Sequence, residues 1–79
     1  MAILKMFGPA REAAGRGSIE LIGATVGEIL SVACDQFGEQ FRAVLSSSTI
    51  WVNGERAGDD SRVHDGDEIA VLPPVSGGL

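Results

Sequence analysis

The sequence predicts an α+β domain: a mixed sheet of four to five strands, one main helix packed on one face, and an extended C-terminal tail. Three observations predict it. Strand-like apolar segments lie at both ends of the chain, a capped amphipathic helix lies between them, and Pro-Pro-Val-Ser-Gly-Gly follows the last apolar segment. A chain of 79 residues forms one domain with one core. We expect a folded domain over residues 1–72 and a flexible tail over residues 73–79.

The composition narrows the classes of partner. The net charge is −5 and the pI is about 4.5, which argues against nucleic acid, because phosphate binding is driven by Lys and Arg. An acidic chain is expected to meet basic surfaces on protein partners. Cys34 is the only cysteine, so no internal disulfide can form, and a reducing cytoplasm fits. The sequence contains no membrane span or signal peptide pattern, so we expect no membrane association.

The first half of the chain predicts two strands. Residues 2–7 are apolar on nearly every position, as in a central strand, and Gly8-Pro9 ends them. Residues 10–14 are helix formers closed by Gly15, which predicts one helical turn. Residues 18–22 alternate polar and apolar, so we expect a half-buried strand antiparallel to the first.

The main helix has the clearest local signal. Thr25 and Glu28 have the spacing of a capping box, and Gly38 closes the helix. Apolar positions 41, 44 and 45 extend this helix or form a satellite to it. The apolar stripe recurs at helical spacing and consists of Val26, Ile29, Leu30, Ala33, Cys34 and Phe37.

The second half predicts three strands. Residues 49–52 are strand-like, Asn53-Gly54 is a strong hairpin signal, and a brief strand follows through Ala57. After turns at residues 58–61 and 65–67, residues 68–72 form the last strand. If the first and last strands are parallel neighbours at the centre of the sheet, the arrangement is the ubiquitin-like β-grasp. The tail then leaves from the end of a central strand.

No set of residues predicts catalysis by this chain itself. Cys34 lies on the apolar stripe, which indicates a small buried hydrophobic residue, and His64 lies in a polar loop without a second ligand nearby. There is no Ser/His/Asp set, phosphate-binding loop or metal-ligand cluster in the sequence. We therefore expect a chain that is not an enzyme on its own and that binds no metal or cofactor.

The tail is built for insertion into a partner. Pro73 and Pro74 fix φ and remove two N–H donors, which ends the sheet and stiffens the stem. The segment from Pro73 to Gly78 spans roughly 20 Å when extended, at about 3.3 Å per residue. Because glycine has no Cβ, Gly77 and Gly78 allow close approach of a reacting group.

Four segments carry a family resemblance: residues 7–15, 52–55, 65–68 and 72–78. Over its whole length the chain resembles the ubiquitin-like sulfur-carrier family, and within it the small subunits of molybdopterin synthase. The resemblance implies that a ubiquitin-activating-type enzyme adenylates the terminal glycine with ATP. A sulfurtransferase then supplies sulfur to form a thiocarboxylate. The tail next enters the large synthase subunit, in a heterotetramer, and delivers sulfur to a pyranopterin in molybdenum cofactor biosynthesis.

The resemblance also implies roles for individual residues. Gly78 carries the adenylate and the thiocarboxylate, with Gly77 before it. Phe7, Arg11 and Leu72 lie at positions near the tail exit and are expected to contact the partner. The remaining partner-binding residues are expected in the tail itself: Pro73, Pro74, Val75 and Ser76.

Other functions stay open at this point. One alternative is a sulfur carrier for a different acceptor, such as thiamine thiazole, cysteine or tRNA. Another is a protein modifier. Chains of the protein on itself are disfavoured, because Lys5, in a central strand, is the only lysine. A plain β-grasp interaction domain would leave the Pro-Pro-Val-Ser-Gly-Gly segment without a role.

Leu79 departs from the family, whose mature members end at the second glycine. Either Leu79 is trimmed from a precursor or it is a residue added after the natural end. In both cases we expect Gly78 to be the functional terminus.

Overall fold

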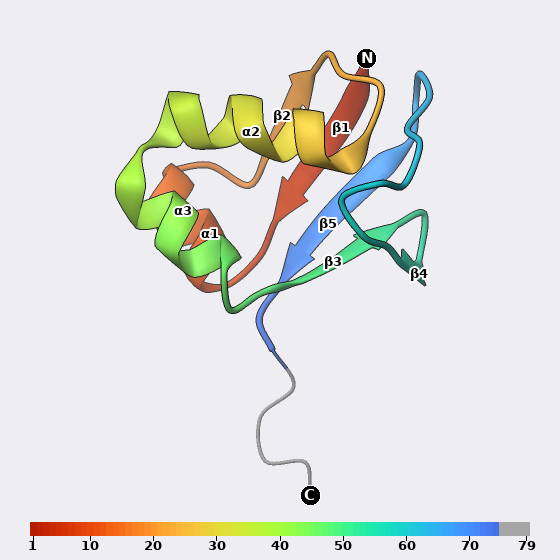
Figure 1. The fold of residues 1–79 in the computed structure, drawn as a ribbon. Helices are drawn as coiled ribbons and strands as arrows, with labels where there is room; N and C mark the ends of the chain where they lie inside the picture. The colour runs from red at the N-terminus through yellow and green to blue at the C-terminus, as the bar shows by residue number, and fades with distance from the viewer. Residues whose placement is uncertain (75–79) are drawn as a thin grey trace, which may run out of the picture.

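The computed structural model describes residues 1–74 as a five-stranded sheet with the strand order β2-β1-β5-β3-β4, accompanied by helices (Figure 1). The described elements are β1 (Ala2–Met6), α1 (Pro9–Ala14), β2 (Ser18–Leu21), α2 (Val26–Phe37), α3 (Glu39–Leu45), β3 (Thr49–Val52), β4 (Glu55–Arg56) and β5 (Glu68–Leu72). This arrangement confirms the predicted α+β, ubiquitin-like β-grasp fold. The expected boundary at residue 72 stays a prediction, because residues 75–79 lie outside the described part.

The two terminal strands form the centre of the sheet. β1 and β5 pair in parallel, with Met6 opposite Val71, while β2 and β3 flank them in antiparallel pairing. In both central strands buried residues alternate with more exposed ones, and Leu4, Met6, Ile69 and Val71 are at most 1% exposed. The predicted parallel pairing of the first and last strands is confirmed.

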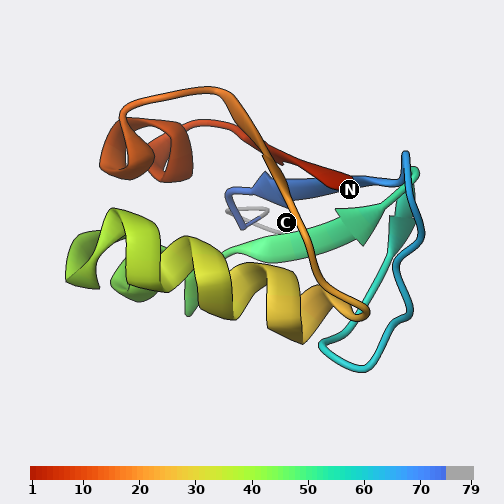
Figure 2. The same ribbon diagram turned by 90° about the horizontal axis from the view of Figure 1, so that it is seen from above.

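The helices lie on one side of this sheet, toward the left in Figures 1 and 2. α2 begins as predicted: Thr25 Oγ1 accepts a hydrogen bond from the Glu28 N–H at 3.2 Å. Glu28 Oε1 reaches back one residue further than expected and accepts from the Ala24 N–H at 2.8 Å. The predicted apolar stripe of α2 packs onto the strand residues of the core, and Cys34 is 5% exposed.

α3 is a separate helix, which settles the two alternatives for positions 41–45. Gly38 has φ 97° and ψ −169°, so the chain leaves the helical conformation there and α2 ends. The Gly38 carbonyl then accepts from the Arg42 N–H at 3.2 Å in the first turn of α3. Phe41 is fully buried, and its ring meets the Phe37 ring edge-on at a centroid distance of 5.1 Å. α3 is therefore a satellite that closes the core.

Some strand ends differ from the sequence prediction. β1 stops at Met6, so Phe7 lies just beyond it, although the Phe7 N–H still donates to the Val71 carbonyl at 3.2 Å. β2 stops at Leu21, which is opposite Ala2, the first residue of its partner strand β1, so Ile22 lies just beyond the paired region. β4 ends one residue before Ala57. The result is that Phe7 and Ile22 are 43% and 73% exposed.

The burial of Phe41 predicts a large effect on stability. Phe41→Ala is expected to lower the free energy of unfolding by about 3–5 kcal/mol, through lost apolar burial and the cavity left behind. Val32→Ala on the exposed side of α2 is the matched control, and its effect should stay within about 0.5 kcal/mol. Urea unfolding of both variants measures the difference. Equal midpoints would show that α3 contributes nothing to the core.

Candidate functional site

The candidate site is the point where the chain leaves the sheet. Because β1 and β5 are parallel neighbours, their C-terminal ends lie side by side at the same end of the sheet. A Cβ built on Gly8 would lie 3.6 Å from Cγ of Pro73. Phe7 and Gly8 therefore lie beside Leu72 and Pro73, as the ends of β1 and β5 show in Figure 1.

Gly8 makes this close arrangement possible. Its φ of 57° and ψ of −130° fall in a region that is essentially restricted to glycine. This conformation turns the chain from β1 into α1, and the Glu12 N–H donates back to the Gly8 carbonyl at 3.1 Å. The turn thus places the start of α1 directly after β1, with Gly8 beside Pro73.

The chain is held in the sheet up to Leu72, the last residue before the tail. Leu72 is half-buried and pairs with Thr49 of β3, whose Oγ1 donates to the Leu72 carbonyl at 3.5 Å. Pro73 and Pro74 are exposed and have no backbone N–H to continue the pairing. The predicted residues Val75, Ser76, Gly77 and Gly78 lie outside the described residues.

Arg11 lies apart from this exit. Its side chain is exposed and lies over Gly17, where a built Cβ would be 3.5 Å from the Arg11 Cζ. The Gly17 carbonyl accepts from the Met6 N–H, so Arg11 lies on the β2 side of β1, whereas the tail leaves on the β5 side. The structure brings Phe7, Leu72 and Pro73 together and places Arg11 across β1 from them. Its contact with a partner stays a prediction.

The sheet face opposite the helices was not predicted as part of the site. We call it the open sheet face, and it carries Ile3, Lys5, Thr49, Trp51, Ala70 and Leu72, which alternate with the core residues along their strands or share the face by pairing. Trp51 Nε1 donates to Thr49 Oγ1 at 3.1 Å, and the Arg56 guanidinium lies 5.7 Å from the centre of its ring. The proximity of Arg56 to Trp51 could have been predicted from the sequence, since a two-residue turn at Asn53-Gly54 pairs Arg56 with Trp51.

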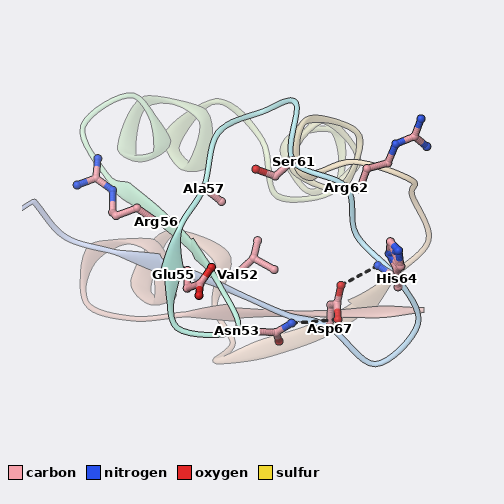
Figure 3. A pocket seen from close by; sticks show the side chains of 9 residues that line it. All are labelled: Val52, Asn53, Glu55, Arg56, Ala57, Ser61, Arg62, His64 and Asp67. Carbon is pink, nitrogen blue, oxygen red and sulfur yellow. Dashed lines mark hydrogen bonds between the residues drawn. The ribbon is translucent and has the colours of Figure 1, made fainter.

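A hollow of about 540 Å³ lies at the other end of β5, between the β3–β4 hairpin and the loop that precedes β5 (Figure 3). Asp67 Oδ2 accepts from the His64 N–H at 2.8 Å, and Asp67 Oδ1 accepts from Asn53 Nδ2 at 3.0 Å. The hydrogen bond from the His64 backbone N–H, and then the one from the Asn53 side-chain amide, lower the pKa of Asp67. Asn53 Oδ1 in turn accepts from the Glu68 N–H at 3.0 Å. These polar groups hold the hairpin to β5.

The two other residues considered for a chemical role are His64 and Cys34. His64 is exposed in the loop, as predicted. Burial raises the pKa of the Cys34 thiol, which keeps it protonated and agrees with the predicted buried apolar role. Within residues 1–74, no group of three or more His, Cys, Asp or Glu side chains is placed to hold a metal ion. In the same described range, none of the helices is long and apolar enough to cross a membrane.

The fold and its exit site define a ubiquitin-like β-grasp protein. The ThiS family profile matches residues 4–78, so the chain belongs to the ThiS family of small sulfur carriers and ubiquitin-like modifiers. Small carriers of this family are generally not catalytic.

Solved structures of similar proteins cover nearly the whole chain. The small archaeal modifier protein 1 (SAMP1) of Methanosarcina acetivorans is 30% identical, with a TM-score of 0.87, over 98% of this chain and 95% of that one. A protein of Pyrococcus furiosus, provisionally assigned as molybdopterin converting factor subunit 1, is 29% identical, with a TM-score of 0.79, over 94% and 97% of the chains. A chain in the Amycolatopsis orientalis BexX/CysO complex is 26% identical, with a TM-score of 0.82, over 99% and 100% of the chains.

The Asp67 hydrogen bonds predict a pH-dependent stability. These hydrogen bonds lower the pKa of Asp67 in the folded chain, whereas an Asp in the unfolded chain has a pKa of about 3.9. In acid the unfolded chain therefore binds more protons than the folded chain. The stabilisation is therefore present above about pH 3.9 and is lost as the pH falls through the lower folded pKa. Asp67→Asn should unfold at lower urea than the wild type at pH 7, and the gap should shrink in acid.

The matched control for this experiment is Asp60→Asn, a change at an exposed loop aspartate. Its urea midpoint is expected to follow the wild type at each pH. A gap between wild type and Asp67→Asn that widened in acid would contradict the assigned hydrogen bonds.

Proposed function

We propose that this chain is a sulfur carrier of molybdenum cofactor biosynthesis, acting as the small subunit of a molybdopterin synthase. The observation that carries the proposal is the stem at the end of β5. It starts the Pro73–Gly78 segment from a fixed point beside Phe7 and Gly8. The family match, which extends to residue 78, supports a functional role for the two glycines.

The proposed chemistry is carried by the terminal carboxylate. A carboxylate is a poor electrophile, so an activating enzyme of the ubiquitin-activating type first joins it to AMP from ATP and releases pyrophosphate. A hydrosulfide equivalent from a sulfurtransferase then forms the C–S bond and displaces AMP, which leaves a thiocarboxylate on Gly78. Since Gly78 has no Cβ, the carbonyl carbon can be approached from either face. In this proposal ATP belongs to the activating enzyme, and the carrier itself holds no cofactor.

The folded domain supplies position. The exposed Phe7 and the half-buried Leu72 flank the stem, and we assign them to contact with the partner. Pro73 to Ser76 then pass into the cleft of the large subunit. With the sulfur held on a docked tail, delivery to the pyranopterin becomes effectively intramolecular, which raises the effective concentration of the reacting group.

The molybdopterin assignment is supported by the similarity to the Pyrococcus furiosus protein and by the matching segments at residues 7–15 and 72–78. The second candidate is a protein modifier, which the 30% identity to SAMP1 favours. Lys5 bears on that candidate, because its Nζ is paired with Glu68 Oε1 at 3.2 Å within the open sheet face. As the only lysine, it is a poor acceptor for chains of this protein on itself.

The first test concerns the terminus. A form ending at Gly78, the form with Leu79 and a form lacking residues 77–79 are incubated with the activating enzyme, ATP and a sulfur donor. Only the Gly78-terminated form should gain the mass of an oxygen-to-sulfur exchange in intact mass spectrometry, because the Gly78 carbonyl is an amide in the longer form and the Gly-Gly terminus is missing from the shorter one. All three should unfold at the same temperature. A thiocarboxylate formed on the intact Leu79 form would refute the assignment of Gly78.

The second test concerns the acceptor. Mixed with a large subunit of molybdopterin synthase, the chain should form a heterotetramer of two large and two small subunits, measured by light scattering. Absence of a complex at micromolar concentrations would refute the molybdopterin assignment. If the thiocarboxylate still formed, the sulfur would have a different acceptor.

A further inference from the structure

The turn between β3 and β4 contains Asn53, the only asparagine of the chain, followed directly by Gly54. An Asn-Gly pair can rearrange without an enzyme. The backbone nitrogen of the glycine attacks the side-chain Cγ, a C–N bond forms, and the amide nitrogen leaves as ammonia with the proton that the backbone nitrogen gives up. Water then opens the cyclic imide and leaves aspartate or isoaspartate. Glycine favours the attack, because it has no Cβ to crowd its nitrogen.

The turn is open to solvent, so water and base can reach it. Asn53 and Gly54 are exposed, and a Cβ built on Gly54 would meet nothing within 4 Å. β4, which follows the turn, consists of only Glu55 and Arg56, and both are exposed. The hollow of about 540 Å³ lies between this hairpin and the loop before β5 (Figure 3). Any protection of the turn therefore comes from its hydrogen bonds.

Three hydrogen bonds fix Asn53 on the β5 side. Asn53 Nδ2 donates to Asp67 Oδ1 at 3.0 Å, the bond drawn between these two side chains in Figure 3, and Asn53 Oδ1 accepts from the Glu68 N–H at 3.0 Å. The Asn53 backbone N–H donates to the Glu68 carbonyl at 2.8 Å. Both polar atoms of the amide and the backbone beside it are thus bound. An amide that turns toward the Gly54 nitrogen has to give up the bonds to Asp67 and Glu68.

Asp67 is a firm anchor for this side chain. Its Oδ2 accepts from the His64 N–H at 2.8 Å, its own N–H donates to the His64 carbonyl at 3.0 Å, and its carbonyl accepts from the Ile3 N–H at 2.9 Å. The hairpin is therefore the part that moves when the two separate. Residues 53–56 are all exposed, so their separation from β5 uncovers no core residue. Such a local opening costs less free energy than unfolding of the domain.

We propose that Asn53 is a site of spontaneous deamidation, protected by Asp67 while the hairpin lies against β5 and exposed when the hairpin separates from it. The released amide then reacts with the Gly54 nitrogen while the rest of the domain stays folded. The inference is independent of the proposed function, because it concerns the end of β5 opposite the tail exit.

The modification works in one direction. Aspartate at position 53 has no Nδ2 donor, and its carboxylate would face Asp67 Oδ1, from which the amide nitrogen lies 3.0 Å away. Like charges placed so close repel each other. Isoaspartate lengthens the backbone within the two-residue turn that sets Trp51 opposite Arg56. Either product therefore weakens the attachment of the hairpin to β5.

The test follows the reaction by mass spectrometry. Trypsin cleaves after Arg42 and Arg56, so residues 43–56 leave as one peptide that contains the site. That isolated peptide is the unfolded reference, and at mildly alkaline pH it should gain the mass of an NH₂-to-OH exchange. The folded full chain should react more slowly by about tenfold or more, because the hydrogen bonds of Asn53 have to open first.

Variants separate local opening from unfolding. Asp67→Ala should accelerate the reaction of the folded chain by about tenfold or more, the effect of losing a hydrogen bond to a charged group. Asp60→Ala, at an exposed loop aspartate, is the matched control and should react as the wild type does. Ile29→Val weakens the core and lowers the urea midpoint, yet its rate should stay within about twofold of the wild type. The wild-type rate should also stay constant in low urea, because local opening exposes little surface.

A folded chain that reacted as fast as the peptide would overturn the protection, and a wild-type rate in Asp67→Ala would overturn the role of Asp67. A rate that rose with low urea, or with the stability lost in Ile29→Val, would assign the reaction to global unfolding. The low-urea measurement uses the wild type alone, so it holds however well the variants fold. Asn53→Asp, which makes one product directly, should unfold at lower urea than the wild type at neutral pH. An unchanged midpoint would contradict the weakened attachment.

Discussion

The parallel pairing of β1 with β5 is the constraint on which the rest of the structure depends. It joins the first and last strands of the described domain through the register of Met6 with Val71, so the core cannot be completed until the whole domain is present. The same pairing places the C-terminal ends of both strands at one end of the sheet. The tail therefore starts between Phe7 and Gly8 on one side and the Thr49 hydrogen bond on the other. Stability and presentation of the tail come from one interaction.

Coverage of a single sheet face follows from the small size of the chain. The alternating residues of the central strands share one core with buried residues of the helices, including the fully buried Phe41 of α3. No second layer covers the other side within the described residues. As a result, one face of the sheet holds the domain together while the other is left open to its surroundings.

Local signals made much of the fold predictable. The α2 cap at Thr25, the Asn53-Gly54 hairpin and the alternating pattern of β5 depend on neighbours in sequence, and they were found where predicted. The separation of α3 depends on the backbone angles of Gly38, and spacing alone did not distinguish a continued helix from a new one. The place of Trp51 on the open sheet face was missed, because it depends on strand register and on which face the helices leave bare. Neither is encoded by adjacent residues.

The direction of β1 has a consequence for how such a domain combines with others. Since β1 runs parallel to β5, the chain begins at the end of the sheet opposite the tail exit, as the N-terminus and the end of β5 show in Figure 1. A protein fused ahead of Met1 would emerge away from the exit and leave the C-terminal segment unobstructed. Under the proposed function, a protein fused behind Gly78 would replace the reactive carboxylate with an amide. Under the proposed function, such a domain can therefore close a longer polypeptide as it stands, and it can open one only if the peptide bond after Gly78 is cut.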